Sequence, residues 1–165
     1  MNKFAMKENG FEYVDLCLPS GTMWATCNVG ASKPEDSGLL FQFGGVAGYK
    51  YGDKNRVINN NKTTTSGKTY KRNDILDLED DAAYVHMGGK WKMPTKSQLE
   101  ELLDNTTYNV VNINGVKGMM LTSNINVQFM FIPFVGWWGN GSFDYAWFNA
   151  NVLSSQMTTY NVTQI

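Results

Sequence analysis

The side chains that most often carry out catalysis are few in this chain, and their spacing does not match a catalytic site. His86 is the only histidine and stands between Val85 and Met87, so we interpret it as a structural residue rather than a general base. Ser154 and Ser155 have no histidine near them in the sequence. The chain has no G-x-S-x-G elbow, no H-E-x-x-H motif and no glycine loop of the phosphate-binding kind. We therefore predict that the protein is not an enzyme.

The two cysteines, Cys17 and Cys27, flank the turn at residues 19–22 unevenly. A hairpin centred there would place Cys17 opposite position 24, so the two thiols are not cross-strand partners. We expect two buried free cysteines, with a disulfide as the alternative. One histidine and two cysteines cannot complete a zinc shell without carboxylates, and we predict no metal and no cofactor.

Three consecutive acids, Glu79, Asp80 and Asp81, allow two interpretations. Clustered carboxylate oxygens could bind calcium. Three consecutive residues point in different directions around a helix, however, and negative charge is favoured in a first helical turn. We favour stabilisation of a helix that starts there.

Residues 47–73 form a polar excursion that holds seven of the fourteen basic residues of the chain. A loop of this length is uncommon inside a domain and is usually a functional or surface loop. Its only aromatic residues are Tyr49, Tyr51 and Tyr70, so we interpret the charge as a solvated surface and expect no nucleic-acid partner.

An aromatic segment lies near the carboxyl end, where residues 137–148 include six aromatic residues in twelve, interrupted by Gly139 and Gly141. Trp137 and Trp138 continue a buried strand, and we expect one of them inside. The rest mix rigid rings with short polar groups, as binding loops do. A partly exposed patch of this kind marks an interaction site. The predicted ligand-binding residues are Phe143, Asp144, Tyr145, Trp147, Phe148, Asn149 and Asn151.

The 165 residues and net charge of −1 indicate a single α+β domain, residues 1–165, in which no apolar run is long enough to insert into a membrane. We expect a strand at 11–16 returning after a turn at 19–22 with Trp24 inward, and a short strand within 39–45. A first helix should cover 78–87, ended by Gly88 and Gly89.

A second helix should begin at Thr95, which with Gln98 forms a capping box. Leu99, Leu102 and Leu103 give that helix one apolar face, and Trp91 is the predicted plug against it. Short strands follow, with Asn114-Gly115 as a hairpin turn and 119–123 pairing with 128–133.

Three segments carry a family resemblance: YVDLCLPSGTMWATCNVGA (13–31), LEDDAAYVHMGGKWKMPTKSQLEELL (78–103) and FIPFVGWWGNGS (131–142). They resemble the C-type-lectin-like domains of Bacteroides-group bacteria and their phages, which are related to the formylglycine-generating-enzyme fold and to the variable proteins of diversity-generating retroelements. The resemblance implies a C-type lectin-like fold of two helices, short antiparallel strands and long loops. It also implies a binding scaffold whose ligand surface corresponds to residues 143–151.

The chain departs from the family pattern at several positions. Cys17 replaces a glycine and Lys92 an arginine, and residues 151–155 lack the ring of the family's Y-W-S-S sequence. The E-P-N and W-N-D sequences of calcium-dependent sugar binding and the catalytic cysteine pair of the formylglycine enzyme are not recognisable. The family has a further C-terminal strand that pairs with the first. We therefore expect that the end of this chain folds back differently or that a neighbouring subunit covers the open edge.

The first ten residues contain no apolar signal-peptide region, which favours a phage protein made in the host cytoplasm over an exported one. We expect a non-enzymatic adhesion module on the virion surface, such as a fibre, head decoration or receptor-binding protein. Its partner would be a host-surface glycan or protein, and it would be an oligomer or part of a larger assembly. The alternatives are a structural virion subunit whose aromatic segment packs on another subunit, a bacterial cell-surface binding protein, and a relative of the formylglycine-generating enzymes.

Overall fold

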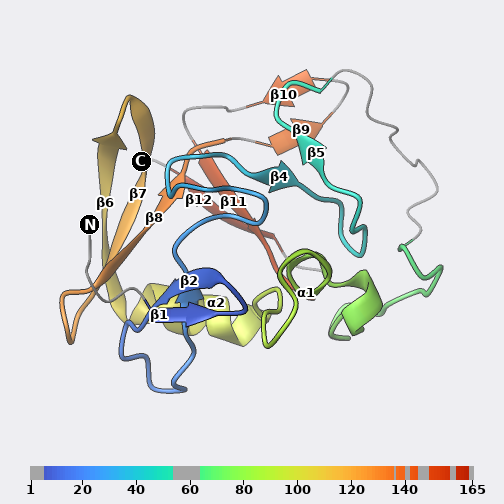
Figure 1. Cartoon of the computed structure of the whole chain (residues 1–165), viewed down its shortest axis with the longest axis horizontal. Coiled ribbons are helices and arrows are strands. Elements are labelled where there is room, and N and C mark those ends of the chain that lie inside the picture. Colours follow the sequence, from blue (N-terminus) through green and yellow to red (C-terminus); the bar gives the residue numbers. More distant parts are fainter. Residues whose placement is uncertain are drawn as a thin grey trace.

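The computed structural model describes residues 6–53, 64–135, 137–139, 142–144, 149–156 and 159–163. It has the expected mixed α+β architecture, with two short helices and several small antiparallel sheets (Figure 1). The helical elements are η1 (Leu78–Asp80, a 3₁₀ helix), α1 (Ala82–Met87) and α2 (Lys96–Asp104). The strands are β1 (Met6–Glu8), β2 (Phe11–Val14), β3 (Trp24–Ala25), β4 (Leu39–Leu40), β5 (Tyr49–Lys50), β6 (Thr106–Ile113), β7 (Val116–Ser123), β8 (Phe129–Pro133), β9 (Trp137–Gly139), β10 (Ser142–Asp144), β11 (Asn149–Leu153) and β12 (Thr159–Thr163). No helix among the described residues has the length and hydropathy needed to cross a membrane.

The longest strands form the antiparallel sheet β6–β7–β8, which stands at the left of Figure 1. Asn114 and Gly115 form the turn between β6 and β7, with φ angles of 50° and 85°. Asparagine and glycine are the residues that adopt positive φ at both central positions of a two-residue hairpin. In the next pair, Met119 lies opposite Ile132 and Leu121 opposite Met130. The predicted hairpin turn and the predicted pairing of 119–123 with 128–133 are confirmed.

Helix α2 begins as its sequence predicts. The Thr95 N–H donates to Gln98 Oε1 at 2.9 Å, and the Gln98 N–H donates to Thr95 Oγ1 at 3.3 Å, which completes the capping box. Leu99 and Leu102 are buried, and Leu103 is half-buried against the same core. Burial of each of the two leucines stabilises the fold by about 1.5–3 kcal/mol. The helix ends where Asn105 Nδ2 donates to the Glu101 carbonyl at 2.8 Å and Thr106 Oγ1 to the Leu102 carbonyl at 2.7 Å.

The main core lies between α2, the β7–β8 pair and the N-terminal chain around β2 and β3. Trp24 points into this core, as predicted. The buried residues of the main core are Val14, Leu16, Leu18, Trp24, Leu99, Leu102, Met119, Leu121, Met130, Ile132 and Phe134.

A carboxylate joins the turn after Leu18 to α2. Glu101 Oε1 accepts the Ser20 N–H at 2.8 Å, and Gln98 Nε2 donates to Thr22 Oγ1 at 3.3 Å. These two contacts hold the turn against the helix.

The prediction that Trp91 plugs the apolar face of α2 is not met: Trp91 is half-buried, and its Nε1 donates to the Glu8 carbonyl in β1 at 2.8 Å.

The predicted helix at 78–87 is two shorter helices, η1 and α1. Asp81 separates them in an extended conformation with φ −91° and ψ 108°. Its carboxylate accepts the Tyr84 N–H at 3.0 Å and so caps α1. An aspartate at this position competes with the helical backbone for hydrogen bonds, which explains the interruption. A second, smaller core of Leu76, Ala82, Ala83 and Met93 packs around this region, with half-buried Val29, Phe41, Phe43 and Tyr70.

Both cysteines are free, as expected, but they are not both buried: Cys17 is exposed and Cys27 is half-buried. Cys17 has a φ of 52°, in the left-handed region that favours glycine.

The end of the chain pairs with its own preceding strand. Strand β12 is antiparallel to β11, with Asn151 opposite Asn161, and β1 pairs only with β2 among the described strands.

Candidate functional site

The aromatic segment, residues 137–151, is not one continuous loop. Strands β9 and β10 pair antiparallel, and the register places Phe143 opposite Trp138 and Asp144 opposite Trp137. Asn149 and Asn151 lie in β11, opposite Thr163 and Asn161 of β12. The predicted ligand-binding residues therefore belong to two different strand pairs.

Three of the predicted residues, Tyr145, Trp147 and Phe148, lie outside the described residues. For Phe143, Asp144, Asn149 and Asn151 the structure describes the strands and their pairing but not the side chains. The exposed aromatic patch thus stays a prediction.

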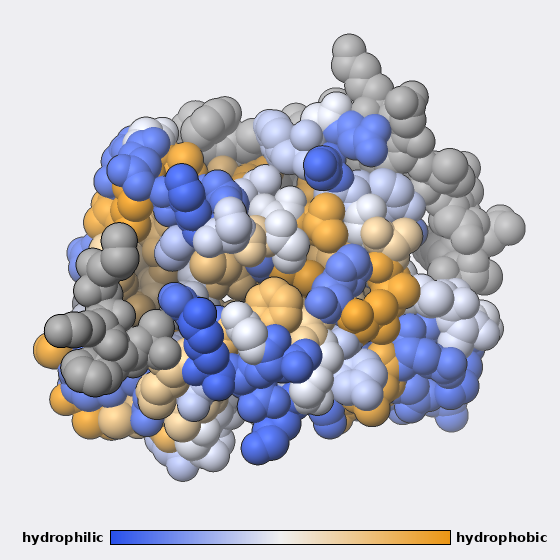
Figure 2. Space-filling model, viewed as in Figure 1, coloured by the Kyte–Doolittle hydropathy of each residue, from blue (hydrophilic) through white to orange (hydrophobic). Residues whose placement is uncertain are grey.

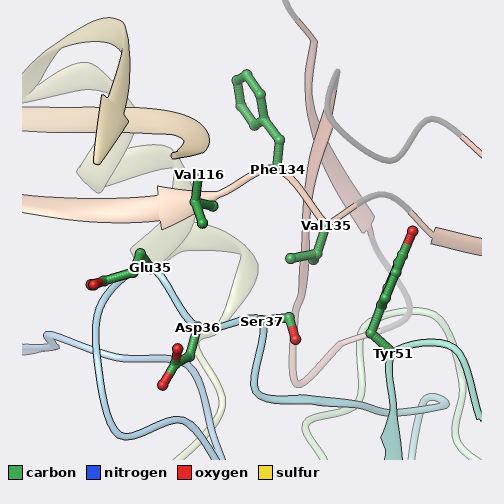
Figure 3. A pocket seen from close by; sticks show the side chains of 7 residues that line it. All are labelled: Glu35, Asp36, Ser37, Tyr51, Val116, Phe134 and Val135. Atoms are coloured by element: carbon green, nitrogen blue, oxygen red, sulfur yellow. The ribbon is translucent and has the colours of Figure 1, made fainter. Parts of the chain in front are cut away.

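A cavity of about 250 Å³ adjoins the start of this segment (Figure 3). It opens between the loop that precedes β4 and the end of β8. Val135, the last described residue before β9, forms one side of the cavity, and the ring of Tyr51 lies on the same side. The lining residues are Glu35, Asp36, Ser37, Tyr51, Val116, Phe134 and Val135.

The wall at residues 35–37 is held to the β6–β7 hairpin by one side-chain contact. Asn114 Nδ2 donates to Glu35 Oε1 at 2.7 Å, across 79 positions of sequence. This hydrogen bond lowers the pKa of the Glu35 carboxyl, with smaller contributions that include the charge of Lys33. The same hydrogen bond turns the Glu35 carboxylate toward the hairpin turn. In Figure 3 this carboxylate points away from the centre of the cavity.

Two further hydrogen bonds, one from a side chain and one from the backbone, close the same wall at its base. Asn28 Nδ2 donates to the Ser37 carbonyl at 3.2 Å, and the Leu39 N–H donates to the Val29 carbonyl at 2.8 Å. Gly38 between them has a φ of 66°, and a Cβ built there would lie 2.5 Å from the Val29 carbonyl oxygen. Glycine is therefore required for the close approach of the two chain segments.

The opposite wall belongs to the main sheet. The Phe134 N–H donates to the Lys117 carbonyl at 2.9 Å, which continues the β7–β8 pairing beyond Pro133. Phe134 is 2% exposed and anchors this end of the strand in the main core, whereas Tyr51 is 43% exposed. One wall of the cavity is thus fixed by the core, and the Tyr51 ring offers a flat surface to a ligand.

This lining is suited to binding. It offers two valines, an aromatic ring and the polar side chains of Asp36 and Ser37, which together can hold one small group such as a sugar ring or a protruding side chain. Pockets with an apolar lining and a few polar groups at the rim are the usual form of binding sites.

The acidic trio has a structural role. Asp80 is fully buried and accepts from the Ser66 N–H at 2.7 Å and the Tyr70 hydroxyl at 2.7 Å. Burial tends to raise the pKa of Asp80, but the hydrogen bonds from Ser66 and Tyr70 outweigh it, and the net pKa is lowered. Asp81 caps α1 and also accepts the Met93 N–H at 2.9 Å. No group of three or more potential ligand side chains arranged to hold a metal occurs in the part of the chain that the structure describes.

His86 makes the hydrogen bond expected of a structural histidine. Its Nε2 lies 2.8 Å from the Val46 carbonyl oxygen, and its ring meets that of Phe41 edge-on at 5.3 Å. The contact ties α1 to the segment between β4 and β5.

Sequence reasoning did not identify the residues of the cavity. The turn-rich character of 31–38 indicates a loop, but nothing local to that loop shows that Glu35 contacts Asn114 or that Tyr51 approaches Val135. Comparisons of the chain with protein-family models, with curated proteins and with solved structures find no match.

Proposed function

We propose that this protein is a non-enzymatic ligand-binding module with a C-type-lectin-like fold, displayed on the surface of a phage virion. The observation that supports the proposal most directly is the cavity beside Tyr51 and Val135. It lies where the chain enters the aromatic segment, next to Val135.

The proposed ligand is a glycan or a protein of the host surface. Ring-rich surfaces with short polar side chains bind such partners through large contact areas and adaptable hydrogen bonds. Tyr51 and the predicted rings of Tyr145 and Trp147 would supply the contact area, and Asp36 and Ser37 would supply hydrogen bonds. The virion setting rests on the resemblance to phage proteins of the lectin-like group.

A glycan-array and host-cell binding assay tests the proposal. The wild type should bind, and Tyr145→Ala/Trp147→Ala and Tyr51→Ala should each weaken binding by about tenfold, the usual cost of removing an aromatic anchor. Phe129→Ala is the matched control, because Phe129 is 52% exposed and begins β8, whereas the cavity lies at the other end of that strand. If Tyr145→Ala/Trp147→Ala and Tyr51→Ala both bind as tightly as the wild type, this site is excluded. Stable incorporation into particles without any host binding would instead favour the structural virion subunit.

A further inference from the structure

Strand β6 forms the outer edge of the main sheet. Among the described strands it pairs only with β7, and it does so over eight consecutive positions from Thr106↔Ser123 to Ile113↔Val116. The register has no interruption, so the strand contains no bulge that would turn its edge aside.

On one face of the sheet, side chains of β7 are buried in the main core, but the side chains of β6 on the same face are exposed. The register places Tyr108 opposite Leu121 and Val110 opposite Met119, which are 1% and 0% exposed. Tyr108 is nevertheless 56% exposed and Val110 37%. The covering of the sheet therefore stops at β7, and apolar side chains appear at the left of the surface in Figure 2, where this sheet stands in Figure 1.

The hydrogen bonds of β7 show which backbone groups of β6 point outward. The Ser123 N–H donates to Gln128, and the Lys117 carbonyl accepts from Phe134, so odd-numbered residues of β7 face β8. Even-numbered residues of β7 then face β6, and their partners in β6 are odd-numbered. The N–H and C=O groups of Tyr108, Val110 and Asn112 must point away from the sheet, and no described residue hydrogen-bonds to them.

This edge lacks the features that protect edge strands. Proteins usually shield such an edge with a proline, a charged side chain, a bulge or a short strand. The sequence of β6, TTYNVVNI, has no proline and no charge. A long, uninterrupted and uncharged edge is a template for pairing with another strand.

We propose that β6 pairs antiparallel with β6 of a second copy of this chain, with Val110 on the two-fold axis. In an antiparallel pair, the two residues that exchange hydrogen bonds lie opposite each other. The even-numbered residues of β6, whose backbone groups point outward, must therefore lie opposite even-numbered residues of the second copy. Val110 would exchange both backbone hydrogen bonds with its counterpart, and Tyr108 would do so with Asn112 of the second copy. The two copies would form one continuous sheet.

Charge favours a second copy over a different partner. A strand without charged side chains offers no ion pair to a charged peptide, whereas two identical neutral strands meet without like-charge repulsion. The whole chain has a net charge of only −1, so repulsion between two copies is also weak.

Sedimentation velocity over a concentration series tests the pairing with Val110→Pro and Val110→Lys. Proline removes an outward N–H and leaves the β6–β7 hydrogen bonds in place, and edge strands tolerate it there. Lysine places two like charges at the axis. Wild type should dimerise reversibly, and each variant should dimerise at least about tenfold more weakly. Far-UV circular dichroism verifies that each variant is folded.

Mixing provides an independent measurement. Val110→Lys and Val110→Glu should each be monomeric alone and should associate with one another, because opposite charges then meet at the axis. Hydrogen exchange of the Tyr108, Val110 and Asn112 amides should slow as the wild-type concentration rises. A monomeric wild type, a dimer unaffected by Val110→Pro, or amides protected equally at all concentrations would overturn the proposal. The last result would mean that another segment of the same chain covers the edge.

Discussion

At the scale of single residues, the buried carboxylate of Asp80 decides how the segment at 64–70 is held. It has no exposed surface and accepts from the backbone and side chain of Ser66 and from the Tyr70 hydroxyl. Charge-assisted hydrogen bonds of this kind are stronger than neutral ones. Burial of the carboxylate would be unfavourable without them.

Asp80→Asn should therefore lower the free energy of unfolding by about 2–3 kcal/mol, because an amide turns donor hydrogens toward the donors of Ser66 and Tyr70. Urea unfolding at pH 7 measures the change. Glu79→Gln is the matched control: Glu79 is its neighbour, its side chain is 60% exposed, and its contact with Lys68 is a surface ion pair. The control should change stability by less than about 0.5 kcal/mol.

The pH dependence of the same variant has a defined sign. The pKa of Asp80 is lowered on folding, so its ionised form stabilises the fold above the unfolded-state pKa of about 3.9. That contribution is lost as the pH falls through the folded-state pKa. The stability difference between wild type and Asp80→Asn should shrink below about pH 4, and a constant difference down to pH 2 would contradict this assignment.

At the scale of elements, the β6–β7 turn does two things with one residue. Asn114 has a φ of 50°, which asparagine tolerates, and its side chain holds the Glu35 carboxylate. The turn therefore links the main sheet to the wall of the cavity.

Two substitutions separate these roles. Asn114→Ala should lower the free energy of unfolding by about 1–2 kcal/mol, because alanine is strained at positive φ. Asn114→Gly should keep most of the stability. Both variants remove the donor, so in both the pKa of Glu35 should rise toward its usual value of about 4.3. Carboxyl NMR titration measures that pKa, and an unchanged Glu35 titration in both variants would show that the contact does not form.

The elements also show what sequence patterns can and cannot predict. The α2 capping box, the Asn114-Gly115 turn and the pairing of β7 with β8 follow from local spacing, and each is confirmed. The pattern of apolar residues predicts one continuous helix over 78–87. It does not show that Asp81 is extended and caps α1, and this is why the prediction is wrong at that residue. The contacts of Trp91 with Glu8 and of Glu35 with Asn114 join positions about 80 residues apart, and no local pattern encodes them.

At the scale of the whole molecule, the two hydrophobic cores are joined by a short buried segment. Ser155 donates its N–H to the Pro94 carbonyl at 2.8 Å and accepts the Leu76 N–H at 2.9 Å, and it is 1% exposed. Leu76 belongs to the second core, and Pro94 immediately precedes the cap of α2, which packs in the main core. Asp81 adds a link within the second core, because it caps α1 and accepts the Met93 N–H.

These links predict that the two cores unfold together. Met93→Ala truncates a residue that is 8% exposed in the second core and should cost about 2–4 kcal/mol. Native-state hydrogen exchange measures this. Relative to wild type, Met93→Ala should lower the free energy of opening by the same amount for the slowest amides of β7, in the main core, and for those of α1. Val85→Ala, at a 48% exposed position of α1, should leave both unchanged within about 0.5 kcal/mol. If Met93→Ala lowers protection in α1 alone, the second core opens independently, and the wall of the cavity at residues 35–37 would be anchored to the main sheet only through Glu35 and Asn114.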